Sequence, residues 1–128
     1  MRVLSARIHG YLDFVLIAIL VIGPFAVGLG GTPALISWLL AALHLIVTLA
    51  TRFPMGVWRV IPFVVHGLIE LAVAAFFAAL PFTGGYSPGS PARRFYVTMA
   101  AFVFLVWVLT DYRATESGYN ARPEGGLS

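Results

Sequence analysis

The chain has 128 residues, of which 60% are hydrophobic and only 10% are charged. This apolar surface exceeds what a water-soluble domain of that length can bury, so an ordinary soluble domain is excluded and lipid is expected to cover the rest. The net charge of +3 comes from arginines at the ends of apolar runs. Such a pattern indicates anchors at a membrane interface and excludes the basic stripe of a nucleic-acid-binding surface. Without cysteine, disulfides and thiolate metal sites are also excluded.

Four apolar segments are long enough, or nearly so, to cross a hydrocarbon core as helices, which takes about 20 residues. They cover residues 8–29, 33–51, 61–82 and 92–110. The glycine-rich connection Gly28-Leu29-Gly30-Gly31-Thr32-Pro33 predicts a helix stop, followed by a helix with Thr32 as N-cap and Pro33 as first residue. The sequence therefore predicts an all-α, integral membrane four-helix bundle.

Arginines are distributed unequally between the two sides of this four-span chain. Arg93 and Arg94 fall on one side and the other six fall on the opposite side, with both termini. The positive-inside rule then places both termini in the cytoplasm. All eight basic residues are arginine, which we interpret as the bias of a GC-rich bacterial genome, so the predicted location is the bacterial cytoplasmic (inner) membrane.

An internal repeat appears when the chain is aligned with itself at an offset of 57 residues. The matched positions include His9 with His66, Gly10 with Gly67, Asp13 with Glu70, and Pro24 with Pro81. An insertion of two residues then aligns Thr51-Arg52-Phe53 with Thr110-Asp111-Tyr112. We predict two tandem hairpins, residues 1–53 and 54–112, and a polar tail, residues 113–128. Because each hairpin has two spans, an axis along the membrane normal should relate them.

The repeated unit resembles a known family. It consists of His-Gly, an acid three residues after the glycine, and Pro-aromatic near the far end of the first span, and in these features it is similar to the SPW-repeat family of small bacterial membrane proteins. The resemblance covers residues 2–112, with Gly23-Pro24-Phe25 and Leu80-Pro81-Phe82 where the family has Ser-Pro-Trp. It implies two-span repeats and the topology above, and it implies no catalytic residues.

Two pairs of polar residues lie inside the first and third spans. His9 with Asp13 and His66 with Glu70 are each four residues apart, so each pair lies on one helix face. An acid in hydrocarbon is costly, so both pairs should face the bundle interior. If the first and third spans meet, the four side chains could bind a divalent metal or relay protons. Alternatively, each carboxylate bonds its own histidine and no ligand binds.

His44 stands outside the repeat, because Val103 occupies the matching position. It could ligate a haem or pigment, or it could be a buried histidine bonded to a nearby hydroxyl or carbonyl. We favour no cofactor among a divalent metal, a haem and a pigment. Arg52 and Asp111 have opposite charges at matching positions, which predicts a structural clamp between the hairpins.

Other repeated residues have structural interpretations. Pro24 and Pro81 fall late in their spans and should shape the bends between helices. Gly10 and Gly67 should allow close approach of a neighbouring helix.

No nucleophile beside a base, phosphate-binding loop or thiol pair is apparent, so we expect no enzyme. The favoured role is a structural or accessory membrane protein that acts through helix packing, as a homo-oligomer or as a subunit of a larger, energy-transducing complex. The alternative is a metal-binding or proton/ion-conducting protein that uses the paired histidines and carboxylates.

Overall fold

A computed structural model describes residues 3–113, which form four helices and no β-strand. The helices are α1 (Ala6–Val27), α2 (Gly31–Ala50), α3 (Phe63–Thr83) and α4 (Pro91–Leu109). Each is long and apolar enough to cross a membrane, which confirms the all-α class and the four predicted spans. The predicted tail lies outside the described residues except for Arg113.

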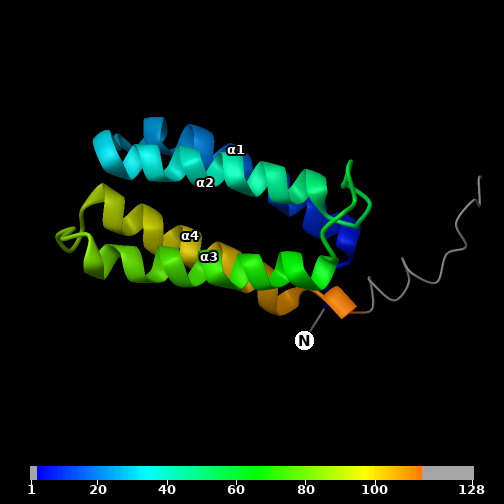
Figure 1. The fold of residues 1–128 in the computed structure, drawn as a ribbon. Coiled ribbons are helices and arrows are strands. Elements are labelled where there is room, and N and C mark those ends of the chain that lie inside the picture. The colour runs from blue at the N-terminus through cyan, green and yellow to red at the C-terminus, as the bar shows by residue number, and fades with distance from the viewer. Residues whose placement is uncertain (1–2, 114–128) are drawn as a thin grey trace, which may run out of the picture.

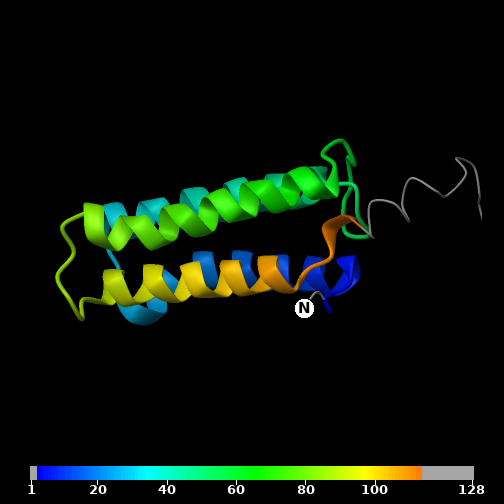
Figure 2. The same cartoon turned by 90° about the horizontal axis from the view of Figure 1, so that it is seen from below.

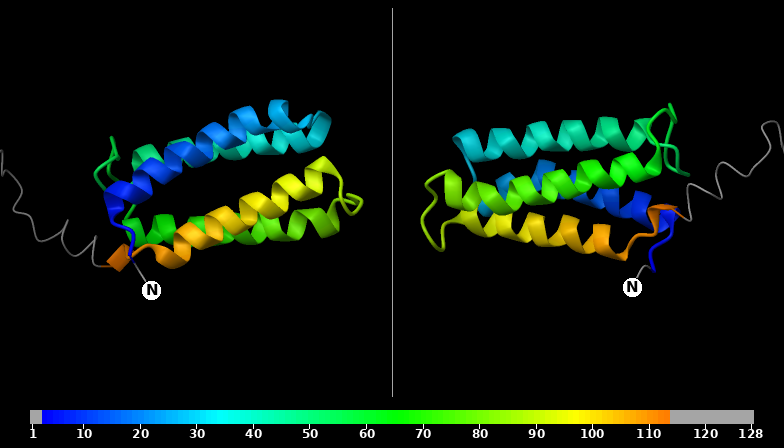
Figure 3. Two further views of the ribbon diagram at one scale, coloured as in Figure 1. Left: turned by 180° about the vertical axis from the view of Figure 1, so that it is seen from behind. Right: turned by 60° about the horizontal axis from the view of Figure 1, so that its bottom comes forward.

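The helices form two hairpins that pack against each other. α1 packs along α2 in one layer, and α3 packs along α4 in the other (Figure 1). Seen from below, α3 lies over α2 and α4 lies over α1 (Figure 2), so α1 and α3 occupy one diagonal of the bundle. The connection 51–62 lies at the same end as both ends of the described chain (Figure 3). We call this the terminal end and the opposite one the hairpin end.

At the hairpin end, the predicted stop of the first helix is confirmed, but the predicted start of the second helix is wrong. α1 stops at Gly28, which adopts a left-handed φ of 72° and donates its N–H to the carbonyl of Pro24. The prediction for the second helix was wrong, because α2 begins at Gly31 with Gly30 as N-cap. Thr32 and Pro33 lie inside the first turn. Proline is tolerated there because the first N–H groups of a helix have no acceptor within the helix.

Apolar side chains face both outward and inward. Phe25, Leu39 and Leu68 are 60% or more exposed, as expected for a surface in contact with lipid. The interior between the cluster of polar residues described below and the hairpin end is filled by apolar side chains, which we call the apolar core. It includes Leu16, Leu20, Ala41, Ala74, Phe77, Tyr96, Met99 and Val103.

The repeated glycines face side chains that come from outside the helices. A Cβ atom at Gly67 would lie 2.9 Å from the ring of Tyr112. A Cβ atom at Gly10 would overlap Met55 and would lie 3.1 Å from the ring of Phe53. Glycine at both positions therefore lets the segments after α2 and α4 pack directly on α1 and α3.

Candidate metal centre

Four buried polar side chains meet at the terminal end of the bundle. His9 and Asp13 come from α1, and His66 and Glu70 come from α3. Each residue is at most 1% exposed. One donor atom of each lies within 4.8 Å of the donor atoms of the other three. Because α1 and α3 lie on a diagonal, these groups occupy the centre of the bundle, and we call them the inner set.

Each histidine of the inner set lies close to both carboxylates and to the other histidine. His9 Nε2 lies 3.2 Å from Asp13 Oδ1 and 3.3 Å from Glu70 Oε1. His66 Nε2 lies 3.4 Å from Asp13 Oδ2 and 3.5 Å from Glu70 Oε1, and the two Nε2 atoms are 3.4 Å apart. A charge-assisted hydrogen bond would bring such atoms to about 2.7–2.9 Å. Bond lengths of about 2.0–2.2 Å to a tetrahedral metal ion would instead place its ligands about 3.3–3.6 Å apart.

Two threonines orient the histidines. Thr51 Oγ1 lies 2.8 Å from His66 Nδ1, and Thr110 Oγ1 lies 2.8 Å from His9 Nδ1. Each hydroxyl also donates to a carbonyl four residues earlier, at 2.6 Å for Thr51 and 2.7 Å for Thr110. A hydroxyl has a single proton, so its oxygen must accept the Nδ1–H of the histidine. In a neutral imidazole this assignment leaves the lone pair on Nε2, which faces the centre.

The carboxylates are also held by hydrogen bonds. The Tyr112 hydroxyl donates to Glu70 Oε2 at 2.5 Å, which leaves Oε1 facing the centre. Burial, reinforced by the charge of Glu70, raises the pKa of Tyr112, so the phenol keeps its proton and remains a donor. Thr48 Oγ1 donates to Asp13 Oδ2 at 3.5 Å. Outer partners of this kind fix the orientation of metal ligands.

Charge in the inner set has to be balanced. Two carboxylates lie near each other in an interior with little water, where like charges repel strongly. One divalent ion would balance both carboxylates and give a neutral centre. Protonated imidazoles are the other means of balance, because the Nε2 atoms of His9 and His66 lie 3.2–3.5 Å from both carboxylates.

Apolar groups enclose the site on both sides. Phe63 and Tyr112 pack their rings 5.2 and 5.4 Å from the ring of His9, and Phe53 stacks on Phe63 at 5.3 Å. These three aromatic residues are at most 6% exposed. On the other side the apolar core separates the inner set from the hairpin end. The arrangement therefore favours holding an ion over conducting one.

His44 lies against the inner set, a position that the sequence interpretation did not anticipate. Its Nε2 atom is 3.3 Å from Asp13 Oδ1, so a haem iron bound at this atom would have to displace that carboxylate. For this reason we assign no haem or pigment role to His44. The clamp between Arg52 and Asp111 stays a prediction, while Arg52 Nε donates to the carbonyl of Arg59 at 3.3 Å.

Sequence reasoning also missed Thr51, Thr110 and Tyr112 as parts of the site. A signal was present, because the two threonines occupy matching positions of the repeat, as do Phe53 and Tyr112. A hydroxyl at the matching position of both repeat units was the signal that could have pointed to these hydrogen bonds.

Known proteins provide no independent support for this site. No protein-family model, curated protein or solved structure matches the chain.

Proposed function

We propose that this is a membrane protein that binds one divalent transition-metal ion through His9, Asp13, His66 and Glu70. A contrast between two sets of distances carries the proposal. Outer hydrogen bonds to Nδ1 of the histidines and to Oε2 of Glu70 are 2.5–2.8 Å long. The five separations that involve the Nε2 atoms of His9 and His66 are 3.2–3.5 Å, and the outer bond from Thr48 to Asp13 is also 3.5 Å long. Groups bonded directly to each other would approach more closely, whereas ligands of a shared ion would keep this spacing.

The proposed ion has a structural role. Its ligands come from α1 and α3, so it joins the two hairpins across the diagonal of the bundle. Protein encloses all four ligands, as in structural metal sites and unlike catalytic sites, which keep an open position. Lipid provides no hydrophobic force between helices, so a cross-link of this kind would contribute strongly to their association.

The same proposal includes the tandem repeat and the membrane topology. Equivalent residues make equivalent contacts: the bonds His9–Thr110 and His66–Thr51 are both 2.8 Å long. Isolated parallel bridges, Leu4 with Thr110 and Ile61 with Thr51, also match under the repeat. Arginines gather at the terminal end, which supports cytoplasmic termini in a bacterial inner membrane. We also propose that the chain belongs to the SPW-repeat family and that it has no enzyme activity.

Metal analysis of the purified protein tests the function. The full chain would be isolated in mild detergent, dialysed against excess Zn²⁺ or Co²⁺, freed of unbound ion and analysed for metal per chain. We expect one ion per chain, and none when His9→Gln and His66→Gln are combined. Ser37→Ala is a matched control, because it removes another buried hydrogen bond, from Ser37 to the carbonyl of Leu20 at 2.6 Å.

Each outcome of this test is decisive. Stoichiometric metal in the natural protein and the control, with loss only in the double variant, supports the proposal. A helical natural protein that binds neither ion would overturn it and would assign the inner set to bound protons. Equal metal in the natural protein and the double variant would place the ion elsewhere and would also overturn it.

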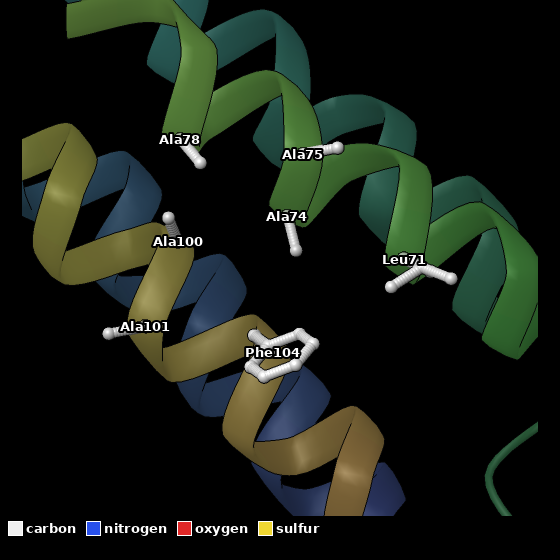
Figure 4. A pocket seen from close by; sticks show the side chains of 7 residues that line it. All are labelled: Leu71, Ala74, Ala75, Ala78, Ala100, Ala101 and Phe104. Carbon is white, nitrogen blue, oxygen red and sulfur yellow. The ribbon is translucent and has the colours of Figure 1, made fainter.

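A second candidate is the accessory role that the sequence favours, and a groove between α3 and α4 supports it. The groove has a volume of about 370 Å³ and is lined by Leu71, Ala74, Ala75, Ala78, Ala100, Ala101 and Phe104 (Figure 4). Small residues allow close helix approach in lipid. In the first hairpin Ile17 and Val21 replace Ala74 and Ala78, whereas the other three alanines have alanine at the matching positions, so the lining is only partly repeated. We propose that a helix of a second copy fills the groove.

Cross-linking tests this contact without background, because the chain has no cysteine. Ala101→Cys should form a disulfide-linked dimer in membranes under oxidation. Leu39→Cys, on the exposed face of α2, should remain monomeric. Equal cross-linking at the two positions, or none at Ala101→Cys, would contradict a dimer through α3 and α4.

A further inference from the structure

Two arginines at the hairpin end have no acidic partner within the described part of the chain. Arg93 and Arg94 lie in the first turn of α4, just after the connection 84–90 (Figure 1). The acids of residues 3–113 all lie towards the terminal end, in the inner set and at Asp111. The positive charge at the hairpin end is therefore not balanced by these residues.

Both guanidinium groups are placed by neighbours that leave them able to bind an anion. Arg93 Cζ lies over the ring of Phe82, 4.6 Å from its centroid. The ring attracts the positive charge but accepts no ordinary hydrogen bond, so the N–H groups remain donors for another partner. Arg94 Nη2 lies beside the connection, because a Cβ atom at Gly89 would be 3.7 Å from it. Arginine binds a phosphate group through two parallel N–H bonds.

Two adjoining grooves surround Arg94. The first has a volume of about 390 Å³ and is lined by Pro88, Gly89, Arg93, Arg94, Val97 and Thr98. The second has a volume of about 350 Å³, reaches α1, and is lined by Val27, Pro91, Arg94, Phe95 and Thr98. Both arginines face the first groove, whereas most of the lining of the second is apolar. Together the grooves offer a place for an anionic group and, next to it, a place for an apolar chain.

We infer that an anionic phospholipid occupies these grooves, with its phosphate on Arg93 and Arg94 and one acyl chain against Val27 and Pro91. Headgroups and acyl chains meet at the depth where a membrane-spanning helix begins, and α4 begins at Pro91. Two guanidinium groups complement a headgroup of net negative charge, such as phosphatidylglycerol, and disfavour one that also carries an ammonium group. The inference is independent of the metal ion.

Native mass spectrometry of the full chain, released from detergent micelles, tests the inference. Phosphatidylglycerol and phosphatidylethanolamine with the same acyl chains would be added at equal concentrations. We expect one phosphatidylglycerol adduct per chain, which persists when ammonium phosphate replaces ammonium acetate at equal ionic strength. Equal adducts of the two lipids would overturn a site for an anionic headgroup. Displacement of the lipid by phosphate would assign the arginines to a free anion and would also overturn the inference.

Three variants separate the contributions of charge and groove. Arg94→Gln should lower the affinity for phosphatidylglycerol about fivefold or more, because it removes one basic residue at the lipid phosphates. Val27→Trp should also lower the affinity, since it fills the second groove without changing the charge. Arg7→Gln is the matched control, because it removes the same charge from an exposed arginine at the terminal end, and it should leave the affinity unchanged. No loss in Arg94→Gln or in Val27→Trp, or an equal loss in Arg7→Gln, would contradict the lipid site.

Discussion

The two halves of the bundle are held together differently. In the terminal half, named polar atoms meet at fixed distances, and nearly every one has a second partner that orients it. In the hairpin half, apolar side chains fill the interior of the same four helices. Packing in lipid depends on contact and shape, so many apolar residues can satisfy it, whereas the polar half requires particular atoms. The comparison teaches that the apolar half can be altered without changing the groups proposed to bind the ion.

The largest effect on binding is expected from removing one carboxylate. Glu70→Gln keeps the size of the side chain but leaves the bound ion with one uncompensated positive charge in a buried site. Loss of outer partners typically lowers metal affinity about 10–100-fold, so loss of a ligand should lower it more than about 100-fold. Competition with a calibrated chelator measures the affinity. A change below tenfold would show that Glu70 is not a ligand.

A substitution in the hairpin half should have the opposite profile. Phe77 is fully buried in the apolar core. Phe77→Ala should lower the free energy of unfolding by roughly 3–5 kcal/mol, through the cavity that it leaves, without changing metal affinity. Thermal unfolding in one detergent measures the stability. Phe76→Ala is the matched control, because its neighbouring ring is 44% exposed and should matter little. An affinity that fell with stability would show that the halves are not independent.

Removing the hydroxyls that orient the histidines should have an intermediate effect. Thr51→Val and Thr110→Val should each lower metal affinity about 10–100-fold, because Nδ1 of one histidine loses its acceptor. Thr98→Val is the control, since the exposed Thr98 makes the same type of bond to a carbonyl four residues earlier, at 2.7 Å. Isothermal titration compares the three variants. Equal affinities would mean that the threonines do not position the ligands.

The smallest effect is expected at a position that contacts the site indirectly. Gly67→Ala would place a Cβ atom 2.9–3.0 Å from the ring of Tyr112 and push the phenol away from Glu70. Affinity should fall by up to about tenfold, since only one outer hydrogen bond is weakened. Gly30→Ala is the control, because no atom lies within 4 Å of its Cβ position. No difference between the two variants would remove Tyr112 from the support of the site.

The sequence predicted the spans because length and apolar composition suffice for a helix in lipid. Observed helix ends differ from the predicted ends by at most two residues, as at Phe63, where Pro62 is the N-cap and α3 starts later than expected. The repeat also placed His9 and His66 at the same depth. A shared site also required the first and third spans to meet, and in the structure the two histidines do lie side by side.

Other parts of the site could not be predicted because they depend on the placement of neighbouring helices and on folded connections. Ser37, His44 and Thr48 lie on one face of α2, so the sequence indicates that this face turns inward, but it does not tell which groups of the other helices His44 meets. Tyr112 follows the end of α4, and its place over Gly67 depends on how the chain turns back after the helix. Such turns are set by tertiary contacts that a periodic pattern does not encode.

The division of the inner set between the hairpins has a consequence for biogenesis. Each hairpin supplies one imidazole and one carboxylate from its first helix. Helices first insert into the bilayer and then associate, so an early intermediate with one inserted hairpin would carry only half of a coordination sphere. Two ligands hold an ion weakly. Capture of the ion would thus follow insertion of the second hairpin, and metal content would report how many chains have completed assembly.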